Sequence, residues 1–110
     1  MKNIKKIKSK EELNKILNEN FNKIVLLKFQ AVWCGPCKVY KNNIEQLPNE
    51  IWNNLVVAEA DVDETELLTS EYNVRNIPYT IFFKNSKEIE RFAGLMTTDS
   101  LITKIKNMIK

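Results

Sequence analysis

The chain has 110 residues, of which 44% are hydrophobic and 28% charged, with two glycines, three prolines and no histidine. This composition is typical of a compact globular domain and excludes disordered, fibrous and collagen-like chains. The net charge of +3 comes from lysines spread among acidic residues along the whole chain, so we expect no nucleic-acid binding.

The N-terminal residues, MKNIKKIKSKEEL, are basic but do not lead into an apolar segment of the kind found in signal peptides. Nowhere do about 18 apolar residues follow one another, so we expect no membrane span and a cytoplasmic location. No repeat or linker-like segment divides the chain, and residues 1–110 are therefore predicted to form a single domain. In a reducing compartment, a cysteine pair is more often catalytic or metal-binding than structural.

Hydrophobic patterns predict three elements in the first third of the chain. Residues 4–7 predict a short edge strand. Ser9 begins a capping box, which predicts a helix over residues 10–20. The apolar positions of this helix recur at helical spacing: Leu13, Ile16, Leu17 and Phe21. The run KIVLLKF over residues 23–29 predicts a strand buried on both faces, in which Lys28 is the exception.

The alternation of helices and strands continues after the cysteines. Apolar residues at helical spacing predict a helix that begins at the cysteine motif and ends before Pro48: Cys37, Tyr40, Ile44 and Leu47. The run LVVAEADV over residues 55–62 predicts a second buried strand, interrupted by Glu59. Asp63 predicts the N-cap of a helix that extends to about Tyr72.

The last third of the chain predicts a hairpin and a closing helix. The segments YTIFF and EIERFA, over residues 79–83 and 88–93, are separated by a short polar stretch and predict two antiparallel strands. A final apolar stripe behind Thr98 and Asp99 predicts the helix. Together these elements predict an α/β fold with a central mixed β-sheet of about five strands, helices on both faces and right-handed parallel connections.

The motif WCGPC over residues 33–37 contains the only two cysteines, Cys34 and Cys37. Cys34 follows a predicted strand and begins a predicted helix, where unpaired backbone N–H groups and the helix dipole favour a thiolate. Pro36 suits a first helical turn because it lacks an N–H, and Gly35 lets another backbone approach closely. Residues three apart on a helix come close enough for a disulfide after a modest adjustment. So short a loop constrains the unfolded chain little, and redox chemistry explains the pair better than stabilisation does.

Structural and metal-binding roles for the cysteines fit the sequence less well. Two unrelated buried cysteines would not require the flanking Trp33, Gly35 and Pro36. A zinc site needs about four ligands, and the chain supplies two thiolates and no imidazole. The absence of histidine also excludes Ser-His-Asp and Cys-His catalysis, and two glycines are too few for a phosphate-binding loop. Dithiol–disulfide exchange is the chemistry that remains for the cysteine pair.

Three motifs resemble the thioredoxin family: AVWCGPCK over residues 31–38, NIPYT over 76–80 and FAG over 92–94. Their spacing fits that family over essentially the whole chain. The resemblance implies the thioredoxin fold and the reduction of disulfides in client proteins, with the reversible Cys34–Cys37 disulfide in place of a cofactor. It implies that Cys34 is the exposed attacking thiolate, and that Cys37 resolves the mixed disulfide formed with the client.

The same resemblance implies a client-binding surface around the cysteines. Pro78 would be a cis-proline that faces the disulfide, and Ile77 would offer backbone hydrogen bonds to an extended client segment. Trp33 and Gly94 would complete this shallow apolar surface. The implied partners are a flavoprotein thioredoxin reductase, or an equivalent electron donor, and client proteins, with the chain acting as a monomer. An oxidase or isomerase is the alternative enzyme, and a binding subunit with incidental redox activity is the alternative outside catalysis.

Two charged residues depart from the family pattern. Thioredoxins usually carry a buried Asp where this chain has Lys28, and many relatives have Lys where it has Glu59. We hypothesise that Lys28 and Glu59 form an ion pair beneath the active site, because an isolated buried charge is costly. Glu59 would then accept the proton of Cys37, and the cation would make the protein somewhat more oxidising. The alternative is that Lys28 reaches solvent, and Lys41 is expected to be a solvated helix charge.

Overall fold

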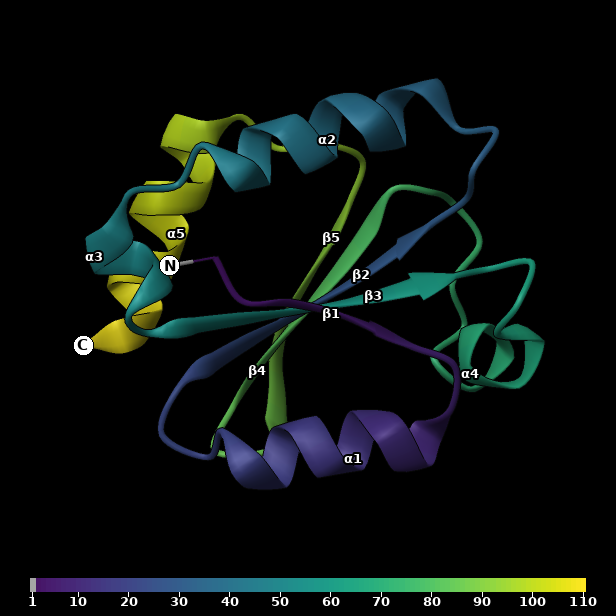
Figure 1. Cartoon of the computed structure of the whole chain (residues 1–110), viewed down its shortest axis with the longest axis horizontal. Helices are drawn as coiled ribbons and strands as arrows, with labels where there is room; N and C mark the ends of the chain where they lie inside the picture. The colour runs from purple at the N-terminus through teal and green to yellow at the C-terminus, as the bar shows by residue number, and fades with distance from the viewer. Residues whose placement is uncertain (1) are drawn as a thin grey trace.

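The computed structural model describes residues 2–110 and contains a five-stranded sheet between two layers of helices (Figure 1). In chain order the elements are β1 (Ile4–Ile7), α1 (Lys10–Glu19), β2 (Ile24–Gln30), α2 (Gly35–Glu45), α3 (Asn49–Trp52), β3 (Leu55–Asp61), α4 (Glu66–Glu71), β4 (Tyr79–Lys84), β5 (Lys87–Ala93) and α5 (Thr98–Ile109). This arrangement confirms the predicted α/β fold, with a mixed sheet and helices on both faces.

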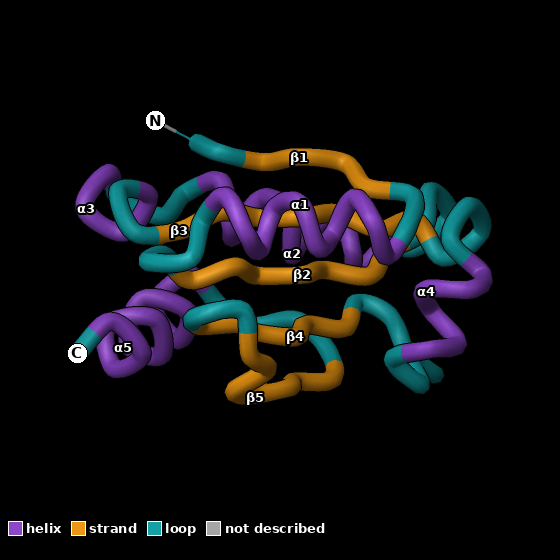
Figure 2. Tube along the Cα trace, turned by 90° about the horizontal axis from the view of Figure 1, so that it is seen from below, coloured by secondary structure: helices purple, strands orange, loops and turns teal. Residues whose placement is uncertain are grey.

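The sheet has the strand order β1-β3-β2-β4-β5, which Figure 2 shows as a stack from β1 to β5. Strand β3 is parallel to both β1 and β2, whereas β4 is antiparallel to both β2 and β5. Strands β2 and β3 are buried along all but their last residue, which explains their nearly continuous apolar sequences. The cysteines therefore follow the central strand of the sheet, at its carboxyl end.

Each face of the sheet has its own core. Helices α1 and α4 cover one face, and their buried residues include Leu13, Ile16, Leu17 and Leu68. Helices α2, α3 and α5 cover the other face, with buried residues that include Tyr40, Ile44, Ile51, Trp52, Leu101 and Ile105. None of the helices formed by residues 2–110 has the length and apolar character needed to cross a bilayer.

Several helix boundaries differ from the sequence-based expectations. Ser9 caps α1 as predicted, because its Oγ accepts the Glu12 N–H at 3.2 Å. The assignment of Phe21 to the buried stripe of this helix was wrong, since α1 ends at Glu19 and Phe21 is exposed. Asp63 is not an N-cap: α4 begins only at Glu66, after a turn.

Helix α3 was not predicted from the sequence. It begins directly after Pro48 and contains a single turn, too short for an apolar period to be visible. Its function in the fold is to bury Ile51 and Trp52 against the core beneath α2 and α5.

The β4–β5 hairpin is closed by Asn85 and Ser86, whose φ angles of 54° and 64° both lie in the left-handed region. Two consecutive residues of this kind form a type I′ turn, whose twist matches that of the flanking strands. The hairpin is thereby confirmed with a connection of two residues rather than the longer polar stretch expected.

Candidate active site

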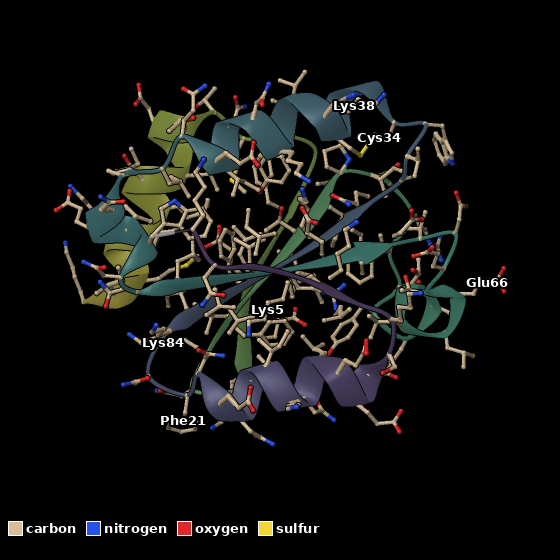
Figure 3. All side chains as sticks on the ribbon, viewed as in Figure 1. Lys5, Phe21, Cys34, Lys38, Glu66 and Lys84 are labelled. Atoms are coloured by element: carbon tan, nitrogen blue, oxygen red, sulfur yellow. A yellow bond between two sulfur atoms is a disulfide. The ribbon has the colours of Figure 1, made fainter. Side chains whose placement is uncertain are left out.

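The two cysteines lie between the end of β2 and the first turn of α2, where Figure 3 labels Cys34. Cys34 is the N-cap residue of α2, with extended backbone, and Cys37 lies in the first turn. Their Cα atoms are 5.3 Å apart, and a disulfide joins them. The helix geometry predicted from the sequence therefore brings both sulfur atoms together.

The two sulfur atoms differ in their electrostatic surroundings. The Cys37 N–H donates a hydrogen bond to Cys34 Sγ at 3.2 Å, so Cys34 acts as a side-chain cap of α2. Within residues 2–110, no corresponding bond reaches Cys37 Sγ. Since helix N-termini stabilise negative charge, a thiolate formed on reduction is favoured at Cys34. Pro36, also in the first turn, has no N–H that would need a partner.

Exposure does not distinguish the two cysteines. Cys34 is 5% exposed and Cys37 is 4% exposed, because the disulfide packs with Ala31 against Val62 and Ile77. The expectation that Cys34 is exposed is therefore wrong for this oxidised form. The asymmetry of the pair lies in hydrogen bonding and helix position instead.

Apolar and backbone groups surround the disulfide. Trp33 is 69% exposed, and its Nε1 donates to Asp63 Oδ2 at 2.8 Å, which holds the ring beside the cysteine turn. The Ile77–Pro78 peptide bond is cis, and the Ile77 side chain packs against the cysteines. Gly94, with φ of 97°, donates its N–H to the Pro78 carbonyl at 2.9 Å, a conformation that favours glycine.

Gly35 borders open space. A Cβ built at this position meets no atom within 4 Å, so no neighbour within the described chain requires a glycine there. The close approach expected at Gly35 is not made by the chain itself, and the space remains available to an incoming segment.

Polar residues lie side by side on three strands beneath α2. Lys28 on β2 is in register with Glu59 on β3 and with Thr80 on β4. All three are buried, and Lys28 Nζ lies 3.1 Å from Glu59 Oε2. Tyr40 of α2 shares a hydrogen bond of 2.7 Å with the Thr80 hydroxyl. The hypothesised Lys28–Glu59 ion pair is thus present, and Lys28 does not reach solvent.

Burial shifts the pKa values of two of these residues, Lys28 and Tyr40. Removal from water lowers the pKa of the Lys28 ammonium below its usual value, and the Glu59 carboxylate opposes part of that shift. Burial also raises the pKa of Tyr40 above its usual range, so its hydroxyl keeps its proton. Glu59 Oε2 is buried and pairs with Lys28 Nζ through opposite charge, and no hydrogen bond of standard geometry reaches this oxygen in the described part of the chain.

A second cation approaches the same carboxylate. Lys41 Nζ, on α2, lies 3.9 Å from Glu59 Oε2, and the Lys41 side chain is about half exposed. Lys41 is thus a solvated helix charge as expected, but it also contacts Glu59, which the expectation did not include. Because Lys41 follows Cys37 by four residues, both side chains occupy the same face of the helix.

Comparisons with known proteins agree on one family. The Thioredoxin family model matches residues 4–107. The chain belongs to the thioredoxin family. It is 35% identical to thioredoxin from Equus caballus over 106 residues, which cover 96% of this chain and 99% of that one. Thioredoxin-T from Drosophila melanogaster is 36% identical over 88 residues, 80% of this chain and 56% of that longer protein.

Solved thioredoxin structures share the fold. The X-ray structure of Fasciola hepatica thioredoxin has a TM-score of 0.84 and 32% identity, and the alignment covers 94% of this chain and 97% of that one. A mutant thioredoxin from Halobacterium salinarum NRC-1 has a TM-score of 0.87 and 30% identity, with 98% of this chain and 92% of that one covered. With its adjacent cysteine pair, this member of the thioredoxin family is a protein-disulfide reductase that works by dithiol–disulfide exchange.

Two contacts of the thioredoxin site were missed by the sequence analysis. Asp63 was assigned to a helix cap but binds Trp33, and Lys41 was assigned to solvent but contacts Glu59. The spacing of four residues indicates that Lys41 lies on the same face of α2 as Cys37, but it does not indicate the contact with Glu59. Among residues 2–110, no group of three or more acidic or cysteine side chains is arranged to hold a metal ion.

Proposed function

We propose that Cys34 is the attacking thiol and Cys37 the resolving thiol of this reductase. The Cys34 thiolate attacks a client disulfide, forms a mixed disulfide and displaces one client thiolate, which takes up a proton. The Cys37 thiolate then attacks Cys34 Sγ and displaces the second client thiolate. Two electrons pass from the dithiol to the client, and the Cys34–Cys37 disulfide re-forms. The hydrogen bond from the Cys37 N–H to Cys34 Sγ carries this assignment, because it favours the thiolate at Cys34.

Cys37 must lose its proton before it attacks, and we assign that proton to Glu59. The Glu59 carboxylate is buried beneath α2 and has an oxygen without a hydrogen-bond partner in the described chain. Lys28 balances its charge, and this cation, together with Gly35 and Pro36 in the first turn, tunes the redox equilibrium. Positive charge near the thiols stabilises the reduced form, so we expect a somewhat more oxidising protein than a thioredoxin with a carboxylate at position 28.

Clients are proposed to bind across Trp33, Ile77, Pro78 and Gly94. Trp33 supplies exposed apolar area, and Gly94 supports the Pro78 carbonyl. The backbone N–H and C=O of Ile77 have no hydrogen-bond partner within residues 2–110, so they are free to pair with an extended client segment. This surface recognises backbone and apolar groups more than particular side chains.

We further propose a cytoplasmic, monomeric, single-domain protein that a flavoprotein thioredoxin reductase or an equivalent electron donor keeps reduced. Its clients are disulfide-containing proteins. Its redox group is the cysteine pair itself, and neither nucleic acid nor membrane is among its proposed partners.

Reduction of insulin by dithiothreitol tests these roles. The wild-type chain should accelerate the reaction, whereas Cys34→Ser should match the uncatalysed rate, as should the doubly substituted Cys34→Ser/Cys37→Ser chain. A wild-type chain without turnover would identify a binding subunit instead. Turnover that survives in Cys34→Ser would show that Cys34 is not the attacking residue.

A further inference from the structure

Lys41 links two features of the active site that are otherwise separate. It contacts the buried Glu59 carboxylate, and it lines a hollow of about 160 Å³ into which Cys37 also faces. The other lining residues are Gln30, Ala31, Val32 and Lys38. A neighbouring hollow of about 190 Å³ is lined by Glu59 and shares Gln30 and Val32 with the first. The resolving cysteine and the buried carboxylate thus open on adjoining spaces.

Two ammonium groups approach one buried carboxylate oxygen in this region. Glu59 Oε2 faces two ammonium groups, Lys28 at 3.1 Å and Lys41 at 3.9 Å. Lys28 is buried and in register with Glu59, so it is the cation that this carboxylate compensates. The Lys41 side chain is 46% exposed and lines the same hollow as Cys37, so its positive charge can act on that cysteine. Glu45, one turn beyond Lys41 on α2, also acts on Lys28 and forms no ion pair within residues 2–110.

We propose that Lys41 is a positioning residue for the resolving step, in which its ammonium, held by Glu59, stabilises the thiolate that forms at Cys37. This inference rests on the roles proposed above for the two cysteines. The thiolate has no backbone N–H partner of the kind that Cys34 has, so a nearby cation is the group that lowers the energy of its negative charge. Lys41 neither gains nor loses electrons in this step. Cys37 loses its proton before it attacks Cys34 Sγ, and the attack displaces the client thiolate.

Lys38 provides a matched control on the same helix. It lines the same hollow and carries the same charge, but it is exposed and forms no ion pair in the described chain. Figure 3 shows it beside Cys34, near the start of α2. Because Lys38 follows Cys37 by a single residue, it points roughly 100° around the helix from the cysteine.

Stopped-flow reaction of the reduced protein with 2,2′-dithiodipyridine separates the two steps. This neutral reagent releases one pyridinethione when Cys34 attacks and a second when Cys37 resolves the mixed disulfide. Only the second phase is independent of reagent concentration. In Lys41→Gln the second phase should slow about three- to tenfold, the size expected for one partly exposed charge. The first phase should stay within about twofold, and Lys41→Arg should restore the second.

Each remaining outcome is informative. An unchanged second phase in Lys41→Gln, equal slowing in Lys38→Gln, or a Lys41→Arg chain as slow as Lys41→Gln would overturn the role of Lys41. A wild-type chain without a second phase, or a Cys37→Ser chain that keeps it, would overturn the proposed cysteine roles instead.

Discussion

The two faces of the sheet are built differently. On the face under α1 and α4 the buried residues of the strands are all hydrophobic, among them Leu27 and Phe29 of β2. The face under α2, α3 and α5 also buries Lys28, Glu59 and Thr80 on three adjacent strands. Alternate residues of the same strand, β2, therefore enter an apolar core and a polar row.

The two faces therefore contribute differently to the stability of the fold and to the chemistry of the cysteines. Apolar burial stabilises the fold wherever it occurs, whereas a buried ion pair seldom repays the cost of removing two charges from water. Lys28, Glu59 and Thr80 lie under α2, the helix that carries the cysteines, where a buried charge can change the stability of a thiolate. We infer that the face under α1 and α4 provides stability, and that the opposite face gives up some stability to place charge near Cys37.

The largest expected effect comes from breaking the buried pair. Glu59→Gln leaves the Lys28 ammonium without its carboxylate and should lower the free energy of unfolding by ~3–5 kcal/mol. Urea denaturation measures this loss, with Glu66→Gln as the control because Glu66 points into solvent from α4 (Figure 3).

Glu59→Gln also tests proton transfer. If the pH dependence of Cys37 alkylation is identical in Glu59→Gln and wild type, Glu59 is not the proton acceptor.

A cavity in the apolar face should cost slightly less and leave the chemistry intact. Leu27→Ala removes a fully buried side chain and should lower the free energy of unfolding by about 3 kcal/mol. The rates of both dithiodipyridine phases should stay within about twofold of wild type, because Leu27 contributes no charge. A large change in either rate would show that the two faces are not separable.

Replacing the whole pair should have the opposite sign. In Lys28→Met/Glu59→Leu, two charges give way to apolar side chains, and the chain should gain about 1–2 kcal/mol of stability. Its redox equilibrium with glutathione should stay close to that of wild type, because a cation and the carboxylate that compensates it are removed together. A double variant as unstable as Glu59→Gln would mean that the ion pair is a net source of stability.

The smallest effect is a pH dependence. The native Lys28 has a lowered pKa, whereas the unfolded chain keeps the ordinary value of 10.5, so the unfolded state binds more protons in the interval between them. Stability relative to Lys28→Met/Glu59→Leu should therefore rise as the pH increases through that interval. Urea denaturation of both chains across this range measures the difference, and a fall with rising pH would contradict the lowered pKa.

Sequence patterns predicted most of this architecture because burial dictates periodicity. The apolar runs of β2 and β3 and the capping box at Ser9 correspond to observed elements. Helix α3 was missed because a helix of one turn is too short to show an apolar period. Asp63 was misassigned because an aspartate in a turn can accept a hydrogen bond from a side chain distant in sequence, here Trp33, instead of capping a helix.

At the site, the spacing of Cys34 and Cys37 predicted their geometry, and the family resemblance predicted the cis bond at Pro78. The contact between Lys41 and Glu59 joins a helix to a strand across the interior, so no local pattern could predict its distance. Likewise, the burial of Cys34 depends on Val62 and Ile77, which lie far along the chain.

Limited alkylation tests the central claim most directly, because Cys34 and Cys37 are the only cysteines in the chain. The reduced wild-type protein is treated at neutral pH with less than one equivalent of iodoacetamide, and mass spectrometry of its peptides locates the label. If the helix N-terminus favours the thiolate at Cys34, nearly all of the label lies on that residue. Equal labelling of the two cysteines, or a preference for Cys37, would contradict the account.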